Sequence, residues 1–172
     1  MNRHHLISLS AITALALATL PGSAVGQQKS LKDQLVGTWT LTAWEQIRPD
    51  GSKFQRFGAN PKGVQVFDAS GRAYILFSRP DLPKIASNNP STPTPEEAKG
   101  IVDGSIAYYG TYTVDEGSKI VALKIEASTF ANQVAAADSK RTVTSVSADE
   151  LKMVNTTVLS GGQISYAFKR AK

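Results

Sequence analysis

Glu45 is the carboxylate of this chain whose expected position best suits it for chemistry. It lies in a strand-like run from Leu35 to Arg48, where successive side chains point to opposite faces. If Trp39 faces the interior, alternation places Glu45 on the same inner face, unless a bulge intervenes. There it could transfer a proton or orient a polar ligand group. An unpaired buried carboxylate is costly, so we expect a partner, in either a structural salt bridge or a functional site. The candidate partners are Arg56, Arg72 and Arg141.

Tyrosines form the second group of candidates. Tyr108 and Tyr112 share one face of a strand-like segment, with Gly110 between them leaving space, and Tyr166 lies in the last such segment. A tyrosine combines a large apolar ring with a polar tip. These rings therefore either line a ligand cavity or pack a core without a ligand. The ligand-binding candidates are Glu45, Tyr108, Tyr112, Arg141 and Tyr166.

The composition excludes several common chemistries. The chain has no Cys, and its two histidines, His4 and His5, lie in a segment that we expect to be removed. The remaining chain cannot build a Ser-His-Asp triad, a Cys-His pair or a zinc site of the His/Cys type. Hard cations could still bind carboxylates and carbonyls, but no calcium-loop spacing is present. We therefore expect no metal site and no cofactor.

Residues 1 to 26 have the pattern of a cleavable export signal. Arg3 supplies a positive charge, and an apolar stretch from Leu6 to Leu20 precedes small residues. This stretch is shorter than the roughly 20 residues that a transmembrane helix needs. We expect a signal peptide at 1–26, one domain at 27–172, no stable membrane anchor and a periplasmic or secreted location.

The chain is moderately basic, with 19 Lys and Arg residues against 14 Asp and Glu residues. Removal of Arg3 with the signal changes 19 to 18 and the net charge from +5 to +4. The basic residues are scattered, and exported proteins seldom meet nucleic acid, so no nucleic-acid partner is expected. The charge indicates a solvated surface or, alternatively, weak attraction to anionic envelope components.

Short alternating segments, separated by turn signals, indicate an antiparallel barrel or sandwich. The expected strands are Leu35–Arg48, Val64–Phe67, Ala73–Ser78, Ile106–Val114, Lys119–Ala127, Arg141–Val146, Leu151–Val158 and Gln163–Arg170. Most connections between them are short, so the strands should form an up-and-down meander.

One connection is different, because the segment from Arg79 to Pro95 contains five prolines. Proline cannot donate to a sheet, so this segment is expected to be a Pro-rich surface loop. A short helix from Pro95 to about Val102 should follow, with Thr94 and Glu97 forming a capping box. This unit is either a lid across a barrel opening or a surface connector.

Several motifs of this sequence resemble those of a known family. They are Leu35-Val36-Gly37-Thr38-Trp39, the Asp50-Gly51 turn, Asn60-Pro61-Lys62-Gly63, the Asp68 to Arg72 hairpin, Glu96-Glu97, Tyr108 to Asp115, Arg141 and Phe168-Lys169-Arg170. With them the chain resembles the bacterial and fungal lipocalin-like domain family over most of its length after the signal. The resemblance implies an all-β, up-and-down lipocalin-like barrel with an interior cavity. For most members it implies no assigned activity.

Similarity to lipocalins also implies a structural contact at the closed end of the barrel. There the Arg170 guanidinium would lie over the Trp39 indole. The chain departs from the family pattern in two places. The family commonly has a His near Leu123 and a Pro-Asn-Trp-x-Gly stretch, where this chain has residues 131–135, Ala-Asn-Gln-Val-Ala. A family function that needs that His or Trp is not carried over.

Three functions remain compatible with the sequence. The leading hypothesis is an exported protein that binds a small hydrophobic or amphipathic molecule, with Glu45 or Arg141 orienting a polar group. The second is an isomerase or cyclase in which Glu45 transfers a proton and a Tyr or Arg stabilises negative charge. The third is an envelope interaction protein whose barrel is filled and binds no ligand.

Overall fold

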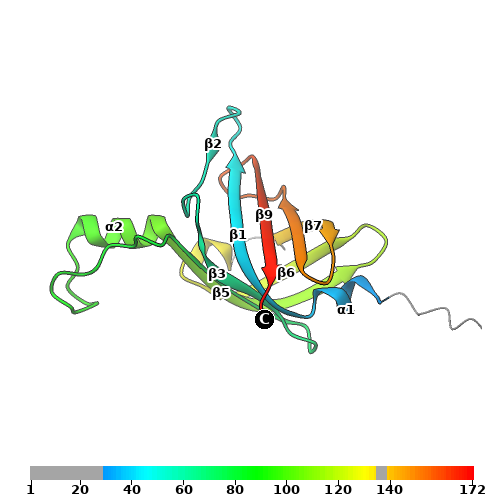
Figure 1. Cartoon of the computed structure of the whole chain (residues 1–172). Helices are drawn as coiled ribbons and strands as arrows, with labels where there is room; N and C mark the ends of the chain where they lie inside the picture. Colours follow the sequence, from blue (N-terminus) through cyan, green and yellow to red (C-terminus); the bar gives the residue numbers. More distant parts are fainter. Residues whose placement is uncertain (1–28, 135–138) are drawn as a thin grey trace, which may run out of the picture.

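A computed structural model describes residues 29–134 and 139–172. The described strands form one antiparallel sheet in the order β2-β1-β3-β4-β5-β6-β7-β8-β9, and a further β1–β9 pairing closes it. Eight strands therefore make a closed barrel, and β2 is an additional short strand beside β1 (Figure 1). The predicted up-and-down barrel is confirmed. The expected signal at 1–26 lies outside the described residues.

The positions of the elements largely follow the hydrophobic alternation of the sequence. Their bounds are α1 (Leu31–Leu35), β1 (Gly37–Ile47), β2 (Lys53–Phe54), β3 (Lys62–Phe67), β4 (Arg72–Ser78), α2 (Pro95–Gly104), β5 (Ser105–Asp115), β6 (Ile120–Ser128), η1 (Ala131–Gln133), β7 (Ser139–Val146), β8 (Glu150–Asn155) and β9 (Gln163–Arg170). Each expected strand is present, although β8 ends at Asn155 instead of Val158. The one-turn α1, the two-residue β2 and the 3-10 turn η1 were not predicted, because such short elements carry little periodicity.

The two ends of the barrel differ in their connections. At the end where β1 begins, tight turns join β3 to β4 and β5 to β6. In each turn an aspartate accepts a backbone hydrogen bond: the Asp68 carboxylate accepts from the Ser70 N–H at 2.5 Å, and that of Asp115 from the Gly117 N–H at 2.9 Å. The long connections, including the Pro-rich loop, lie at the opposite end. We call these the closed end and the open end.

Arg170 and Trp39 organise the closed end. Trp39 is fully buried, and its indole N–H donates to the carbonyl of Leu35 at 2.7 Å. The Arg170 guanidinium carbon lies 4.0 Å from the centroid of the Trp39 ring. Its two terminal nitrogens donate to the carbonyls of Gln34, at 2.7 Å, and Val36, at 2.9 Å. Arg170 therefore caps the last turn of α1, where unpaired carbonyls favour a cation.

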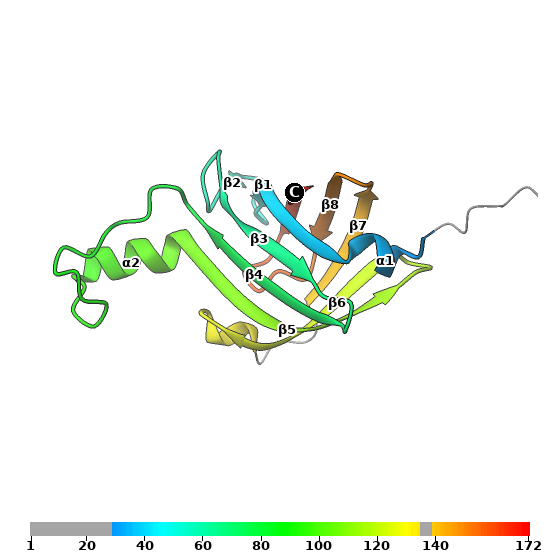
Figure 2. The same ribbon diagram turned by 60° about the horizontal axis from the view of Figure 1, so that its bottom comes forward.

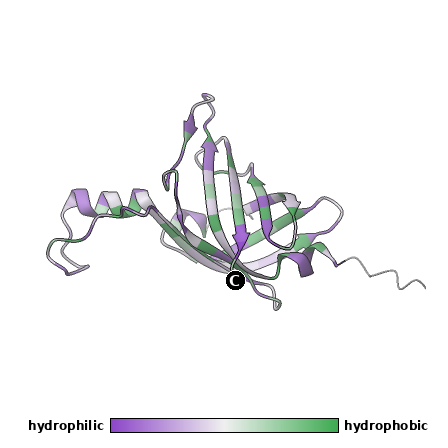
Figure 3. Cartoon of the chain, in the orientation of Figure 1, coloured by the Kyte–Doolittle hydropathy of each residue, from purple (hydrophilic) through white to green (hydrophobic). Residues whose placement is uncertain are grey.

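Aromatic rings fill much of the barrel between its ends. Trp44 packs edge-on against Phe57 with ring centroids 5.2 Å apart, and Phe57 packs against Phe77 at 6.0 Å. Hydrophobic and hydrophilic segments alternate along the strands, as expected for a sheet with one buried face (Figure 3). The core is thus one continuous cluster inside the barrel.

The predicted helix is present as α2. It begins at Pro95, and both hydrogen bonds of the capping box between Thr94 and Glu97 are formed. These bonds satisfy the backbone N–H groups of Thr94 and Glu97 at the start of the helix. In both views α2 continues past the ends of β4 and β5 and projects away from the barrel (Figures 1 and 2). It is therefore a projecting connector and does not lie across the opening.

We expect the Trp39 and Arg170 side chains to stabilise the fold jointly. In a double-mutant cycle with Trp39→Phe and Arg170→Met, the interaction free energy should exceed roughly 0.5 kcal/mol, because the cation stacks on a fully buried indole. Urea unfolding of the four proteins measures it. Additive effects would contradict an energetic role for the contact.

Gly110 should tolerate no side chain. The strand register shifts beside it, and a Cβ there would lie 2.0 Å from the carbonyl oxygen of Lys124. Gly110→Ala should lower the free energy of unfolding by roughly 1 to 3 kcal/mol, since backbone must move. Gly117→Ala is the matched control, because its nearest neighbour beyond the adjoining residues is an Asp115 side-chain atom at 3.5 Å. Equal effects in urea unfolding would refute this account.

Candidate functional site

A bulge in β1 decides which of its side chains enter the barrel. The register against β9 shifts between Leu41 and Ala43. An extra residue reverses the inward and outward alternation of the strand beyond it. Trp44 and Gln46 are consequently buried, each 7 % exposed, and Glu45 points outward. The expectation that Glu45 faces the interior is therefore wrong.

Glu45 forms an ion pair on the outside of the barrel. Its carboxylate lies 3.1 Å from the Lys53 ammonium, and the two side chains are 32 % and 69 % exposed. A pair this exposed contributes little to stability. The arginines considered as its partners bind elsewhere: Arg72 pairs with Glu126 at 2.8 Å, and Arg56 and Arg141 make the contacts described below.

Arg141 is the centre of a polar cluster inside the barrel. It is 2 % exposed, and one terminal nitrogen donates to the side-chain oxygen of Gln65 at 2.8 Å. The other terminal nitrogen donates to the hydroxyl of Tyr108. The Tyr166 ring centroid lies 4.7 Å from the guanidinium carbon. The barrel thus brings together three of the five predicted ligand-binding residues.

Gln65 belongs to this cluster and was missed in the sequence. It is fully buried in β3, two residues before the buried Phe67. Strand alternation was the available signal, since Gln65 and Phe67 occupy the same face. The pairing of β3 with β4 sets Gln65 opposite Ile75, which in turn lies opposite Tyr108 of β5. The interior face of three adjacent strands therefore carries Gln65 and Tyr108 on either side of Ile75.

Tyr112 lies apart from the cluster, near the closed end. Its hydroxyl donates to the carbonyl of Asp68 at 2.8 Å, and its ring packs edge-on against Phe67 with centroids 5.0 Å apart. Burial raises the pKa of the Tyr112 hydroxyl, and the charges of Asp68 and Asp33 raise it further. The hydroxyl remains a donor at neutral pH. Tyr112 therefore anchors the β3–β4 turn, and the Lys124 carbonyl of β6 occupies the space that a side chain on Gly110 would need.

Arg141 is the one charged residue among the buried polar side chains of the described chain. The other three are Gln46, Gln65 and Asn155. Near the open end, the Gln46 side chain donates to the Ser160 hydroxyl and the Gly161 carbonyl, both at 3.0 Å. The Asn155 side-chain oxygen accepts from the Thr157 backbone at 2.8 Å. Those two amides fasten the loop between β8 and β9.

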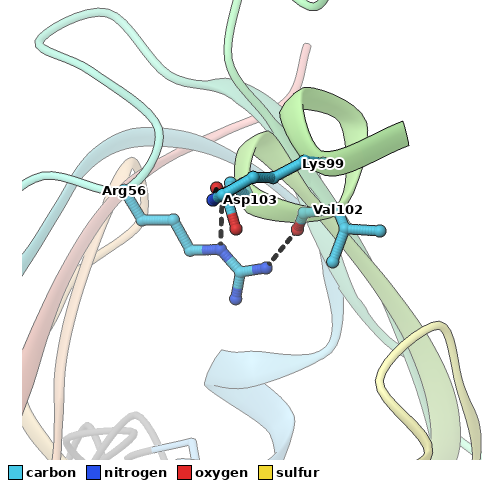
Figure 4. Close-up of polar contacts among 4 residues, drawn as sticks. All are labelled: Arg56, Lys99, Val102 and Asp103. Carbon is cyan, nitrogen blue, oxygen red and sulfur yellow. Dashed lines mark hydrogen bonds and ion pairs between the residues drawn. The ribbon is translucent and has the colours of Figure 1, made fainter. Parts of the chain in front are cut away.

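The loop between β2 and β3 covers the open end. Phe57, in this loop, is 1 % exposed and packs between Trp44 and Phe77. The neighbouring Arg56 binds the C-terminal end of α2: its Nε donates to the Asp103 carbonyl at 2.9 Å, and a terminal nitrogen donates to that of Val102 at 2.7 Å (Figure 4). We call the Arg56 contacts the latch.

The groups of the latch are charged although burial opposes the charge of Arg56. Burial lowers the pKa of the Arg56 guanidinium, and the Asp103 carboxylate opposes this effect. A hydrogen bond from Lys99 holds the pKa of Asp103 below its ordinary value, and the Arg56 charge adds to this effect. A cation at the C-terminal carbonyls of a helix is also stabilised by the helix dipole. The latch therefore keeps its charges at neutral pH.

Two surface depressions lie outside the barrel interior. One, of about 420 Å³, is on the outer face of β4 to β6 beside Tyr74 and Tyr109, whose rings stack with centroids 6.4 Å apart. The other, of about 570 Å³, is lined by residues near α1, including Leu31 and Glu116. Among the described residues, no group of three or more His, Cys, Asp or Glu side chains is placed to hold a metal ion. No described helix is long and apolar enough to cross a membrane.

A protein-family match agrees with this architecture. The family model described as a lipocalin-like domain matches residues 36–169. A crystal structure of a lipocalin-like protein from Bacteroides uniformis has 13 % identity and a TM-score of 0.42, covering 80 % of this chain and 99 % of that one. A redesigned β-barrel has 14 % identity and a TM-score of 0.41, covering 84 % of this chain and all of that one. No curated protein matches. The match over most of the barrel shows that this chain belongs to the lipocalin-like domain family.

Proposed function

We propose that this protein is an exported binding protein that holds a small, largely apolar molecule inside its barrel. The observation that carries the proposal is a path of aromatic rings from the open end to a buried polar group. Phe57 packs against Phe77 at 6.0 Å, and Phe77 contacts Tyr166 at 6.4 Å. Tyr166 then stacks on Arg141. An apolar wall with a few placed polar groups is the usual composition of a small-molecule site.

Entry of a ligand requires the cover of the open end to move. The strands continue around the barrel, whereas Phe57 packs at the open end from the loop between β2 and β3. Loop rearrangement breaks fewer hydrogen bonds than separation of two strands. Ligand entry in this proposal therefore displaces Phe57 and opens the latch between Arg56 and α2.

Export is part of the proposal and is supported by the sequence alone. Residues 1 to 26 have the charge and apolar pattern of a signal peptide, and the chain contains no Cys. A periplasmic or secreted location follows if this segment is cleaved. N-terminal sequencing of exported material should find a chain that begins close to Val25 or Gln27.

The isomerase or cyclase alternative has no supporting observation. It required Glu45 inside the barrel, and Glu45 pairs with Lys53 on the outer surface. The buried polar side chains of the described residues contain no carboxylate. A proton-transfer mechanism based on an interior acid is therefore not favoured by this geometry.

A neutral apolar probe should bind inside the barrel. We expect phenylnaphthylamine to bind with a stoichiometry of one, with Tyr108→Ala changing its affinity by about threefold or more because Tyr108 lies on the interior face. Tyr109→Ala is the matched control: it removes the adjacent tyrosine, which is 42 % exposed on the outer face. Fluorescence titration measures both affinities.

The same titration has two contradicting outcomes. Weaker binding in the Tyr109 variant, with or without weaker binding in the Tyr108 variant, would place the probe in the outer depression, because both tyrosines line it. Absence of binding to the wild-type protein would contradict the proposed function and favour the reading of a filled barrel that acts as an envelope interaction protein.

Opening the latch should accelerate probe binding. In Arg56→Met the α2 carbonyls lose their donors, so Phe57 should leave the open end more often and the association rate should rise by about threefold or more. Arg48→Met is the control, because Arg48 stacks on the exposed ring of Phe54 in the same region, 4.2 Å from its centroid. Stopped-flow fluorescence compares the rates. Equal rates in the wild-type protein and both variants would exclude the latch as a gate.

A further inference from the structure

Arg141 carries a positive charge in a place where charges are expensive. It is 2 % exposed, and no acidic group of the described residues lies within 4 Å of its guanidinium. Arginine remains protonated in proteins, so it cannot avoid the penalty by becoming neutral. A buried cation without an anionic partner loses its hydration without a Coulombic gain. Among the described residues the buried charge of Arg141 therefore has no compensating partner.

The contacts of Arg141 leave hydrogen-bond donors unused. Its Nε has no partner, and neither does the side-chain nitrogen of Gln65. These two side chains are already joined to each other, since the Gln65 oxygen accepts from Arg141. Both unused atoms are donors, and Tyr108 uses its hydroxyl oxygen to accept from Arg141. The cluster is thus short of acceptor oxygens.

Two other arginines, Arg170 and Arg56, bind backbone carbonyl oxygens and so have the acceptors that Arg141 lacks. Arg170 donates through its Nε and both terminal nitrogens to the backbone carbonyls of residues 148, 36 and 34. Arg56 donates through its Nε and a terminal nitrogen to carbonyls at the end of α2. Arg170 thus uses all three guanidinium nitrogens, and Arg56 is only partly buried, so neither leaves a buried donor without a partner. Arg141, by contrast, has partners that fix its orientation, but its buried Nε has no hydrogen-bond partner.

We propose that the ligand of this barrel is an apolar molecule with a carboxylate head group, which binds Arg141, Gln65 and Tyr108. This inference rests on the proposed binding function and adds the chemical class of the ligand. A carboxylate supplies two planar oxygens that match the donors of a guanidinium, and its single negative charge balances the single buried positive charge. A doubly charged phosphate would leave an excess of negative charge.

The surroundings of the cluster fit the rest of such a molecule. Tyr166 covers one face of the guanidinium, and the ring path through Phe77 leads toward Phe57 at the open end. An apolar chain attached to the carboxylate would lie along these rings. The head group enters first, and the apolar body remains nearer the open end.

Two fluorescent probes that differ only in the head group test this inference. We would titrate dansyl-undecanoic acid and its methyl ester into the protein at neutral pH. The acid should bind about tenfold tighter than the ester, or more, as expected for a charge-assisted hydrogen-bonded pair. In Arg141→Met this preference should disappear through weaker binding of the acid, while the affinity for the ester stays within about threefold.

Lys140→Met is the matched control. It removes the same charge from the adjacent position of β7, which is exposed on the outer face. Its preference for the acid should equal that of the wild-type protein. Loss of the preference in both variants would show that net charge, and not the buried cluster, selects the acid, and would overturn the inference.

A second measurement does not depend on a variant that must fold. A carboxylic acid of this kind has a pKa of about 4.3, so below that pH the probe becomes neutral. The wild-type protein should then bind acid and ester equally, with far-UV circular dichroism confirming that the barrel is intact. A preference that persists at acidic pH would contradict the carboxylate. Equal binding at neutral pH would overturn this inference alone, whereas no binding of either probe would overturn the proposed function.

Discussion

The pairing of β1 with β9 closes the sheet, and the positions of the interior side chains depend on how that pairing is made. From Trp39 to Leu41, β1 follows a regular register with Arg170 to Phe168, and the register then shifts before Ala43. The regular part aligns Trp39 with Arg170 and so forms the closed end. The shifted part turns Trp44 and Gln46 into the barrel. One extra residue thus separates a closed end built from a cation and an indole from an open end built from aromatic rings.

The closure of the sheet decides where the charged side chains lie. Acidic and basic side chains of the strands pair on the outer face, as Glu45 does with Lys53 and Arg72 with Glu126. Exposed ion pairs of this kind add little to the stability of the fold, because water solvates both charges when the pair separates. Arg141 has neither option, because it is buried and its partners are neutral. The ion pairs therefore lie on the outside of the barrel, while the interior of the described chain holds the single charge of Arg141. This interior charge, more than the fold, is the basis for the proposed class of ligand.

At each end of the barrel, an arginine binds the carbonyls at the C-terminal end of a helix. Arg170 binds the carbonyls at the end of α1, and Arg56 binds those at the end of α2. At the closed end the cap packs over a fully buried tryptophan and belongs to the core. At the open end the capping residue, Arg56, lies in a loop next to Phe57. A cap on a loop can open at lower cost than a cap on a strand, which is why we assign the gate to this end.

The sequence determined most of the fold by itself. Alternation and turn residues located every long strand, and Thr94 with Glu97 marked the beginning of α2, because these signals are local. Alternation also placed Tyr108, Tyr166 and Trp39 on buried faces. The motifs that resemble the lipocalin-like family indicated a closed barrel, and the family match agrees.

The tertiary structure decided the membership of the interior cluster. The bulge after Leu41 arises from the way β1 fits against β9, and no local signal showed that it would turn Glu45 outward. The partnership of Arg141 with Gln65 joins residues 76 positions apart, and it exists because closure brings β7 across the barrel from β3. Sequence alternation tells which face a side chain occupies, but only closure with a defined register tells which faces meet.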